Sequence, residues 1–213
     1  MTLHIGMLLF PGLTQLDLTG PFELLHRLPD SRVHLVWKDT QPVRADSGLQ
    51  LVPTTPMNDC PPLDILFVPG GLGQAAQMRD PEVLGFLRRQ GASARYVTSV
   101  CTGSLLLGAA GLLEGYEATT HWAFVDVLPA FGARYVKRRV VVDRNRITGG
   151  GVTAGLDFGL RLIAEIAGES VARALQLGLE YDPDPPFRSG HPDVADPVLA
   201  SELRRQFSGL LTR

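Results

Sequence analysis

The sequence predicts an α/β fold in which a mostly parallel central sheet carries helices on both faces. Short apolar runs that end at turn residues alternate with amphipathic stretches, which is the pattern of βαβ units. The runs at 4–10, 65–68 and 96–100 are almost continuously apolar or β-branched, as expected of strands that are buried on both faces. A chain of 213 residues with 45% hydrophobic content is long enough to build this fold as one domain around its own core.

The first half of the chain supplies three of the predicted core strands. The first strand ends at a Pro-Gly turn, and Thr19 is the expected N-cap of a helix that has Pro21 near its first turn. After Pro81, apolar residues recur at helical spacing. The predicted elements are strands at 4–10, 33–37 and 65–68, helices at 21–28 and 81–90, and one arm of a side hairpin at 49–54.

The second half of the chain continues the alternation and brings one strand directly to a cysteine. Residues 96–100 are rich in β-branched side chains and lead into Cys101, and the small apolar stretch that follows predicts a buried helix. Three consecutive glycines at 149–151 mark a turn before a long helix. The predicted elements are strands at 96–100, 134–143 and 146–148, and helices at 102–113, 122–131, 153–167 and 169–179.

Residues 181–213 differ in kind from the α/β domain, which we place at residues 1–180. The segment 181–197 contains five prolines and is therefore unable to join a helix or a central strand. We expect an extended arm followed by a short helix at 197–211. Two interpretations of the arm stay open. It is either a surface wrap or partly disordered tail, or an arm that clasps a second copy of the chain.

Charge and cysteine content disfavour several classes of protein. The 20 Lys and Arg residues nearly balance the 22 Asp and Glu residues, and no block of positive charge is present to neutralise phosphates, so a nucleic-acid partner is disfavoured. Two cysteines do not make a disulfide framework. The first residues lack the basic region of a signal peptide, and no apolar run approaches the roughly 18 residues needed to cross a bilayer. We therefore expect a cytoplasmic protein without a membrane partner.

Cys101 stands between a predicted strand and a predicted helix that begins with Thr102. A turn of this kind lifts the side chain above the sheet, as in the nucleophile elbow of hydrolases, and points the free N–H groups of the helix at it. Because such groups lower the pKa of a thiol, Cys101 is the candidate nucleophile. The alternative is a small buried cysteine at a helix start. Cys60 lies before two prolines in a loop, where a structural or incidental thiol is expected.

Asp17, Gly70 and Gly71 are candidate partners of this thiol. Asp17 follows a predicted strand and lies between two leucines, where burial would raise the pKa of a carboxyl. The alternative is an acid that interacts with a helix N-terminus. Gly70 and Gly71 follow another predicted strand, and their backbone N–H groups are able to approach a reacting atom as an oxyanion-type site requires. The carboxyl ends of parallel strands are where such sheets bind ligands.

His121 is the one histidine that lies among the candidate site residues. It is a candidate partner of Cys101 in a Cys–His arrangement, and a helix-capping or core histidine is an equal alternative. The other histidines are scattered without metal-ligand spacing, so no metal site is expected. The glycines at 149–151 lack the residues of a phosphate loop, and we expect them to let the backbone approach the site closely near Val152.

Three motifs follow one another along the chain: PGG at 69–71, VCTG at 100–103 and ATTHW at 118–122. Together they resemble the ThiJ/PfpI superfamily, which is related to the class I glutamine amidotransferases, and the resemblance covers roughly residues 3–179. Further segments look like one branch, the bacterial isocyanide hydratases; they are LFPG at 9–12, QLDLTGP at 15–21, LVWK at 35–38 and RADSG at 44–48. The resemblance implies a flavodoxin-like sandwich, a homodimer, a nucleophile at Cys101 and an acidic partner at Asp17.

Departures from other branches narrow the resemblance. The proteases and glyoxalase-type chaperones carry histidine directly after the nucleophile, whereas this chain has Thr102, which argues against a Cys-His-acid triad. The redox-protective branch has glutamate where this chain has Asp17. Because aspartate is one methylene shorter, the carboxyl proton is expected to take a different position relative to the Cys101 sulfur. The related transcription regulators append a helix-turn-helix domain, which we do not expect here.

The implied reaction is hydration of an isocyanide, R–N≡C, to an N-substituted formamide without a cofactor. The Cys101 thiolate attacks the terminal carbon to give a thioimidate, and Asp17 acts as general acid and then as general base. The Thr102 hydroxyl is expected to orient Asp17 or the water. Backbone amides near Gly71, Thr102 and Val152 are expected to hold the thiolate or the developing charge.

The substrate pocket of such an enzyme is expected to be apolar, because an isocyanide offers little to a hydrogen-bonding group. Trp122 and Phe10 are the candidate walls. Two alternative functions without turnover stay open. One is a sensor of oxidative stress that uses Cys101, and the other is a small-molecule-binding domain related to the transcription regulators.

Overall fold

A seven-stranded sheet forms the centre of the computed structural model, which describes residues 2–209. The strand order is β10-β11-β7-β6-β1-β2-β5. Neighbouring strands run parallel except for β10 and β11, which pair antiparallel at one edge. The strands are β1 (Leu3–Leu8), β2 (Ser31–Trp37), β5 (Thr55–Pro56), β6 (Ile65–Val68), β7 (Tyr96–Val100), β10 (Val140–Asp143) and β11 (Arg146–Gly149). The predicted mostly parallel sheet is confirmed.

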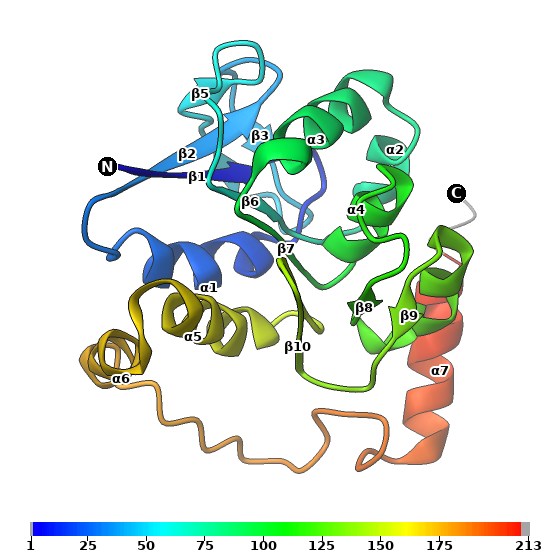
Figure 1. Ribbon diagram of the computed structural model, residues 1–213. Helices are drawn as coiled ribbons and strands as arrows, with labels where there is room; N and C mark the ends of the chain where they lie inside the picture. The colour runs from blue at the N-terminus through cyan, green and yellow to red at the C-terminus, as the bar shows by residue number, and fades with distance from the viewer. Residues whose placement is uncertain (1, 210–213) are drawn as a thin grey trace.

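Helices cover both faces of this sheet, as predicted (Figure 1). One layer contains α1 (Gln15–Leu25), α5 (Ala154–Ala167) and α6 (Glu169–Gly178), and the other contains α2 (Gln74–Gln77), α3 (Pro81–Ser93) and α4 (Gly103–Ala109). Two small sheets lie outside the main one: β3 (Val43–Arg44) pairs antiparallel with β4 (Gln50–Leu51), and β8 (Glu117–Ala118) pairs parallel with β9 (Arg134–Tyr135). The first of these contains the predicted side hairpin.

Close packing of α1 on α5 explains why small residues recur on α5. A Cβ atom on Gly155 would lie 3.0 Å from the Pro21 ring, and one on Gly159 would lie 2.7 Å from Leu24. Beside this contact, Phe158 is fully buried, and its ring centroid lies 5.5 Å from that of Phe67 on β6. The buried apolar side chains of β1, β6 and β7 join those of the helices in the core, as expected of strands covered on both faces.

The helix predicted at 21–28 is wrong in its boundaries. The observed α1 begins at Gln15, so Asp17 lies in its first turn rather than at a strand end, and Thr19 lies inside the helix with its hydroxyl on Gln15 Oε1. Pro21 lies within α1, where it removes one backbone donor from the helix and its ring packs against Gly155 of α5. The alternative of an acid near a helix N-terminus is therefore the geometry observed for Asp17.

Two other predicted helices also differ in form. The one predicted at 102–113 ends early, at Ala109, where the glycine-bearing segment turns away. The one predicted at 122–131 has the expected bounds but 3₁₀ geometry, and it is labelled η1 (Trp122–Phe131). Its end is set by Gly132, which adopts a left-handed conformation with φ +71°.

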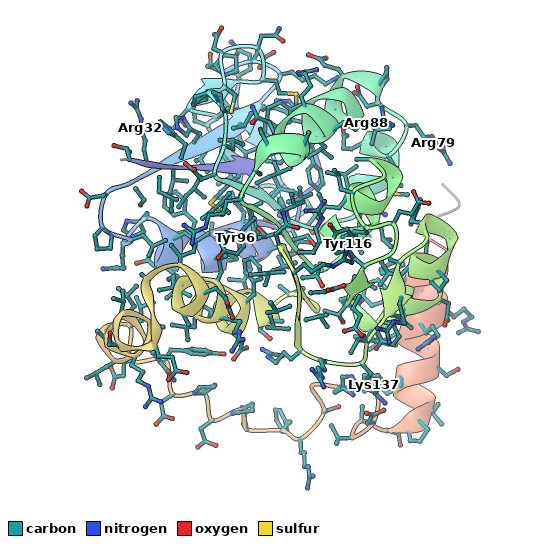
Figure 2. The ribbon with its side chains drawn as sticks, viewed as in Figure 1. Arg32, Arg79, Arg88, Tyr96, Tyr116 and Lys137 are labelled. Atoms are coloured by element: carbon teal, nitrogen blue, oxygen red, sulfur yellow. The ribbon has the colours of Figure 1, made fainter. Side chains whose placement is uncertain are left out.

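The C-terminal segment leaves the α/β layers and returns to them through one helix. Residues 182–196 form no helix or strand and run past α5 and α6 to α7 (Pro197–Ser208), which packs against η1 (Figure 1). The Tyr181 hydroxyl donates to Asp157 on α5, and Lys137 pairs with Asp193 at 2.6 Å, where the side-chain view places Lys137 beside the segment (Figure 2). The predicted end of the last helix at Leu211 lies outside the described residues.

Within the described residues, none of the helices is both long and apolar enough to cross a membrane.

Phe158 provides a test of the core. Phe158→Ala is expected to lower the free energy of unfolding by about 3–5 kcal/mol, because a fully buried ring leaves a cavity when it is removed. Phe187→Ala is the matched control: this ring is 79% exposed, so the change is expected to stay within about 0.5 kcal/mol. Urea denaturation of both variants measures the difference, and equal effects would contradict the assignment of Phe158 to the core.

Candidate functional site

Cys101 occupies a strained turn between β7 and α4. Its φ of +53° lies in the left-handed region that non-glycine residues rarely adopt. The turn is held from several sides: the Cys101 N–H donates to the carbonyls of Gly149 (3.1 Å) and Gly150 (2.9 Å), and the hydroxyls of Thr120 and Ser104 donate to its carbonyl. The surrounding hydrogen bonds therefore hold Cys101 in a left-handed backbone conformation that is unfavourable for a non-glycine residue.

Asp17 is completely buried beneath this turn. Its Oδ2 accepts a hydrogen bond from the Gly70 N–H at 3.1 Å, while no described group meets Oδ1 with conventional hydrogen-bond geometry. Desolvation raises the pKa of Asp17 to about 7, although contacts with the Cys101 thiol and the Gly70 N–H act in the opposite direction. The raised pKa expected for this residue is thus found, with burial as its main cause.

The pKa of the Cys101 thiol is raised well above its usual value, contrary to the expectation from its position at a helix start. Burial is the largest cause, and the neighbouring negative charge of Asp17 adds to it. The backbone N–H and the hydroxyl of Thr102 favour the thiolate, but they do not outweigh these two effects. Above about pH 7 the carboxyl is mostly ionised while the thiol keeps its proton, so the pair then holds one proton, and below that pH it holds two.

The Gly70-Gly71 turn packs directly against these groups. A Cβ atom on Gly70 would lie 2.6 Å from Thr102 N and 2.8 Å from Asp17 Oδ2, and one on Gly71, where φ is +136°, would overlap the backbone of Thr14. The two N–H groups are not free to bind a substrate, because Gly70 donates to Asp17 and Gly71 donates to the Thr102 hydroxyl at 3.0 Å. The expectation of an oxyanion site here is corrected: these groups fix Asp17 and Thr102.

Thr102 is oriented by this same turn. Its hydroxyl is bonded to the backbone of Gly71 rather than to the Asp17 carboxyl. The expectation that this hydroxyl orients Asp17 directly is therefore replaced by an indirect connection through the glycine turn.

His121 lines the same cavity as the Cys101 thiol, but its imidazole caps a helix. Its Nδ1 accepts a hydrogen bond from the Ala123 N–H at 3.3 Å, which makes it the N-cap of η1. Burial lowers its pKa to about 4, so the imidazole is neutral at physiological pH. Among the described residues it forms no hydrogen bond with Cys101. The capping alternative is the one the structure supports.

A cavity of about 160 Å³ opens onto Cys101. Besides Cys101, four predicted site residues lie on its wall: Gly71, Thr102, His121 and Val152. The candidate walls Trp122 and Phe10 do not: Phe10 is fully buried in the core, and Trp122 does not line this cavity. The lining residues that sequence reasoning missed are Thr14, Asp46, Leu72, Gln74, Phe124 and Phe207.

The missed residues come from loops and from a distant helix. Thr14 and Asp46 are joined by a hydrogen bond of 2.6 Å from the threonine hydroxyl to Oδ2, so the loop before α1 and the side hairpin meet at the rim. The RADSG motif that contains Asp46 was the available signal. No pattern in the sequence connects Phe207 to a cysteine so far away in the chain. Among the described residues, no cluster of three or more His, Cys, Asp or Glu side chains is arranged to hold a metal ion.

Comparison with known proteins identifies the family. Residues 4–165 match the model of the DJ-1/PfpI family. The chain belongs to this family. The predicted resemblance and the flavodoxin-like fold are thereby confirmed.

Individual relatives of this DJ-1/PfpI protein cover nearly its whole length. An isonitrile hydratase of Pseudomonas putida is 58% identical over 206 residues, which are 97% of this chain and 90% of the relative. The crystal structure of a ThiJ/PfpI family protein from Pseudomonas syringae superposes with a TM-score of 0.97 at 46% identity and covers 100% of this chain and 88% of the other. The HTH-type transcriptional regulator GbdR of Pseudomonas aeruginosa is 33% identical over 84% of this chain but only half of its own length.

The raised pKa of Asp17 has a measurable effect on stability. Between about pH 4 and 7 the folded protein holds the Asp17 proton while the unfolded chain has released it, so this group makes stability fall by about 1.4 kcal/mol for each pH unit and has no further effect above pH 7. Asp17→Asn removes this dependence. From pH 5 to pH 8 we expect the wild type to lose about 3 kcal/mol more than the variant.

Urea denaturation at the two pH values measures this difference. Asp59→Asn, at an exposed position, is the control and is expected to follow the wild type. An identical pH dependence in wild type and Asp17→Asn would contradict the raised pKa.

Proposed function

We propose that this protein is an isocyanide hydratase, which adds water to R–N≡C and releases an N-substituted formamide. The observation that carries the proposal is a buried carboxyl in contact with a buried thiol at the edge of a small cavity, a pair that holds one proton above about pH 7. Hydration needs this combination of a nucleophile and a proton relay. The 58% identity to an isonitrile hydratase over 97% of the chain supports it.

The first step forms a carbon–sulfur bond. As Cys101 Sγ attacks the terminal carbon of the isocyanide, the thiol proton passes to the Asp17 carboxylate. Asp17, now protonated, delivers that proton to the same carbon. The product is a thioimidate, R–N=CH–S–Cys101, and the pair has used the single proton that it held.

The second step adds water and breaks the carbon–sulfur bond. The Asp17 carboxylate accepts a proton from water as the water oxygen attacks the thioimidate carbon. Asp17 then passes this proton to the nitrogen, which becomes N–H, and the second proton of the water stays on the oxygen. Collapse of this intermediate forms the formamide carbonyl and expels sulfur, and the remaining proton returns to the Cys101–Asp17 pair. The sum is R–N≡C plus water to R–NH–CHO, so the balance requires no oxidant, reductant or metal.

The arrangement favours hydration over the sensing alternative. Reaction with peroxide depends on the thiolate and on access to it, and Cys101 is 95% buried with a raised pKa. The 33% identity to a transcription regulator supports the binding alternative. This alternative predicts saturable binding of a ligand without turnover.

We also propose that the protein is a cytoplasmic homodimer in which residues 1–180 form the catalytic domain and residues 181–213 form an accessory arm. The family resemblance supports the dimer, and the change from an α/β pattern to a proline-rich one supports the division into domain and arm. Light scattering coupled to size-exclusion chromatography measures the oligomeric state, and a monomer mass would contradict the dimer.

The nucleophile is tested by following formamide formation from cyclohexyl isocyanide. Cys101→Ala is expected to reduce turnover to the uncatalysed rate, because the thioimidate is no longer able to form. Cys60→Ala, which removes the other thiol, is expected to keep wild-type kcat/KM. Activity that survives in Cys101→Ala would overturn the nucleophile assignment.

The proton relay predicts a particular pH profile. We expect kcat/KM to rise with pH through about 7, because ionised Asp17 is needed to take the thiol proton, and then to stay level until the thiol itself ionises. Asp17→Asn is expected to lower kcat/KM by about 10²–10⁴ and to remove the rise near pH 7. A wild-type profile that falls through pH 7 would mean that the doubly protonated pair is the active form.

A further inference from the structure

A phenylalanine from the last helix reaches into the catalytic cavity. Phe207 lies near the C-terminal end of α7, and α7 packs on η1 after the exposed segment 182–196 has carried the chain around the molecule (Figure 1). The Phe207 ring centroid lies 5.1 Å from that of His121, 6.0 Å from Phe124 and 6.3 Å from Trp122. Both Phe207 and Cys101 line the cavity of about 160 Å³.

Arg204 provides a described polar contact between α7 and η1. Arg204 pairs with Asp126 at 3.1 Å, but the two side chains are 44% and 83% exposed, and exposed ion pairs are weak. Arg204 also lies over the Trp122 ring at 5.5 Å. The aromatic contacts of Phe207 join the end of α7 directly to the cavity wall, because His121 and Phe124 also line the cavity.

The size and chemistry of the cavity define what it accepts. Apolar side chains from four parts of the chain form much of its wall: Leu72, Phe124, Val152 and Phe207. An apolar protein cavity of roughly 150 Å³ is able to enclose a benzene molecule. The volume beside Cys101 thus matches one six-membered hydrocarbon ring, and two such rings need more volume than this cavity has.

We propose that Phe207 is a specificity-determining residue that limits the substrate to compact hydrocarbon isocyanides, with a group about the size of cyclohexyl or phenyl on nitrogen. This inference rests on the proposed hydratase function. Phe207 takes no part in bond making: it closes the side of the cavity that receives the R group, and its removal opens that side while Cys101 and Asp17 stay in place.

The test compares two substrates in two matched variants. Formamide formation is measured with cyclohexyl isocyanide and with 4-biphenylyl isocyanide for wild type, Phe207→Ala and Phe187→Ala. In Phe207→Ala the ratio of kcat/KM for the biphenylyl over the cyclohexyl substrate is expected to rise about tenfold or more, which is the scale on which pockets discriminate by size. Phe187→Ala removes an exposed ring from the arm and is expected to leave the ratio unchanged.

A second variant guards against a folding defect. Phe207→Leu keeps an apolar side chain of intermediate volume, and the ratio is expected to lie between those of wild type and Phe207→Ala. Turnover of both substrates with the same ratio in wild type and in both Phe207 variants would overturn the proposal while leaving the hydratase function intact.

A third measurement is independent of turnover. In a Cys60→Ala background, Cys101 is alkylated with iodoacetamide and with its N-biphenylyl derivative, and intact mass reports the two rates. Because both reagents attack the same thiolate, their ratio reports access alone. Phe207→Ala is expected to speed the biphenylyl reagent about tenfold relative to iodoacetamide. If the wild type hydrates neither isocyanide, the proposed function fails and this ratio still decides whether Phe207 limits access.

Discussion

The site depends on keeping one carboxyl in a place that water does not reach, against the sulfur of Cys101. Burial favours the neutral form of the carboxyl and of the thiol beside it, so the pKa values of both groups are raised. The negative charge of ionised Asp17 raises the pKa of the thiol further. The glycines around them follow from this requirement. Gly70 leaves room for Asp17 and Thr102, and a Cβ atom on Gly103 would overlap the carbonyls at the end of β6. The end of β6 and the β7–α4 turn thus leave no room for a side chain at Gly70 or Gly103.

Much of this arrangement was predictable from local patterns. The strand at 65–68 and the strand at 96–100 have the predicted bounds, because continuous apolar or β-branched runs between turn residues leave little choice. The position of Cys101 at a strand–helix turn followed directly from them. The raised pKa of Asp17 was predictable because two leucines flank it, and the side hairpin was indicated by its turn residues.

The remaining features depend on burial, charge and tertiary contacts, whose relative strengths are not predictable from a local sequence pattern. The helix start at Cys101 suggested a lowered thiol pKa, but burial and the charge of Asp17 are stronger. The sequence suggested that the N–H groups of Gly70 and Gly71 bind a reacting oxygen. In the structure they donate instead to Asp17 and Thr102, which are distant in the chain. The start of α1 was misplaced because Pro21 resembles a first-turn proline and in fact lies inside the helix. Contact between Phe207 and the cavity depends on the path of an irregular segment, which has no periodicity to interpret.

The division of labour along the chain has a consequence for how such a protein diversifies. Cys101 and Asp17 lie within the part that matches the family model, residues 4–165, whereas one wall of the cavity is provided by α7, beyond the end of that match. Leu72, Phe124 and Val152 place the other apolar walls inside the matched part. If Phe207 acts as proposed, a substitution on α7 therefore changes one wall of the cavity from outside the stretch of the gene that encodes Cys101 and Asp17.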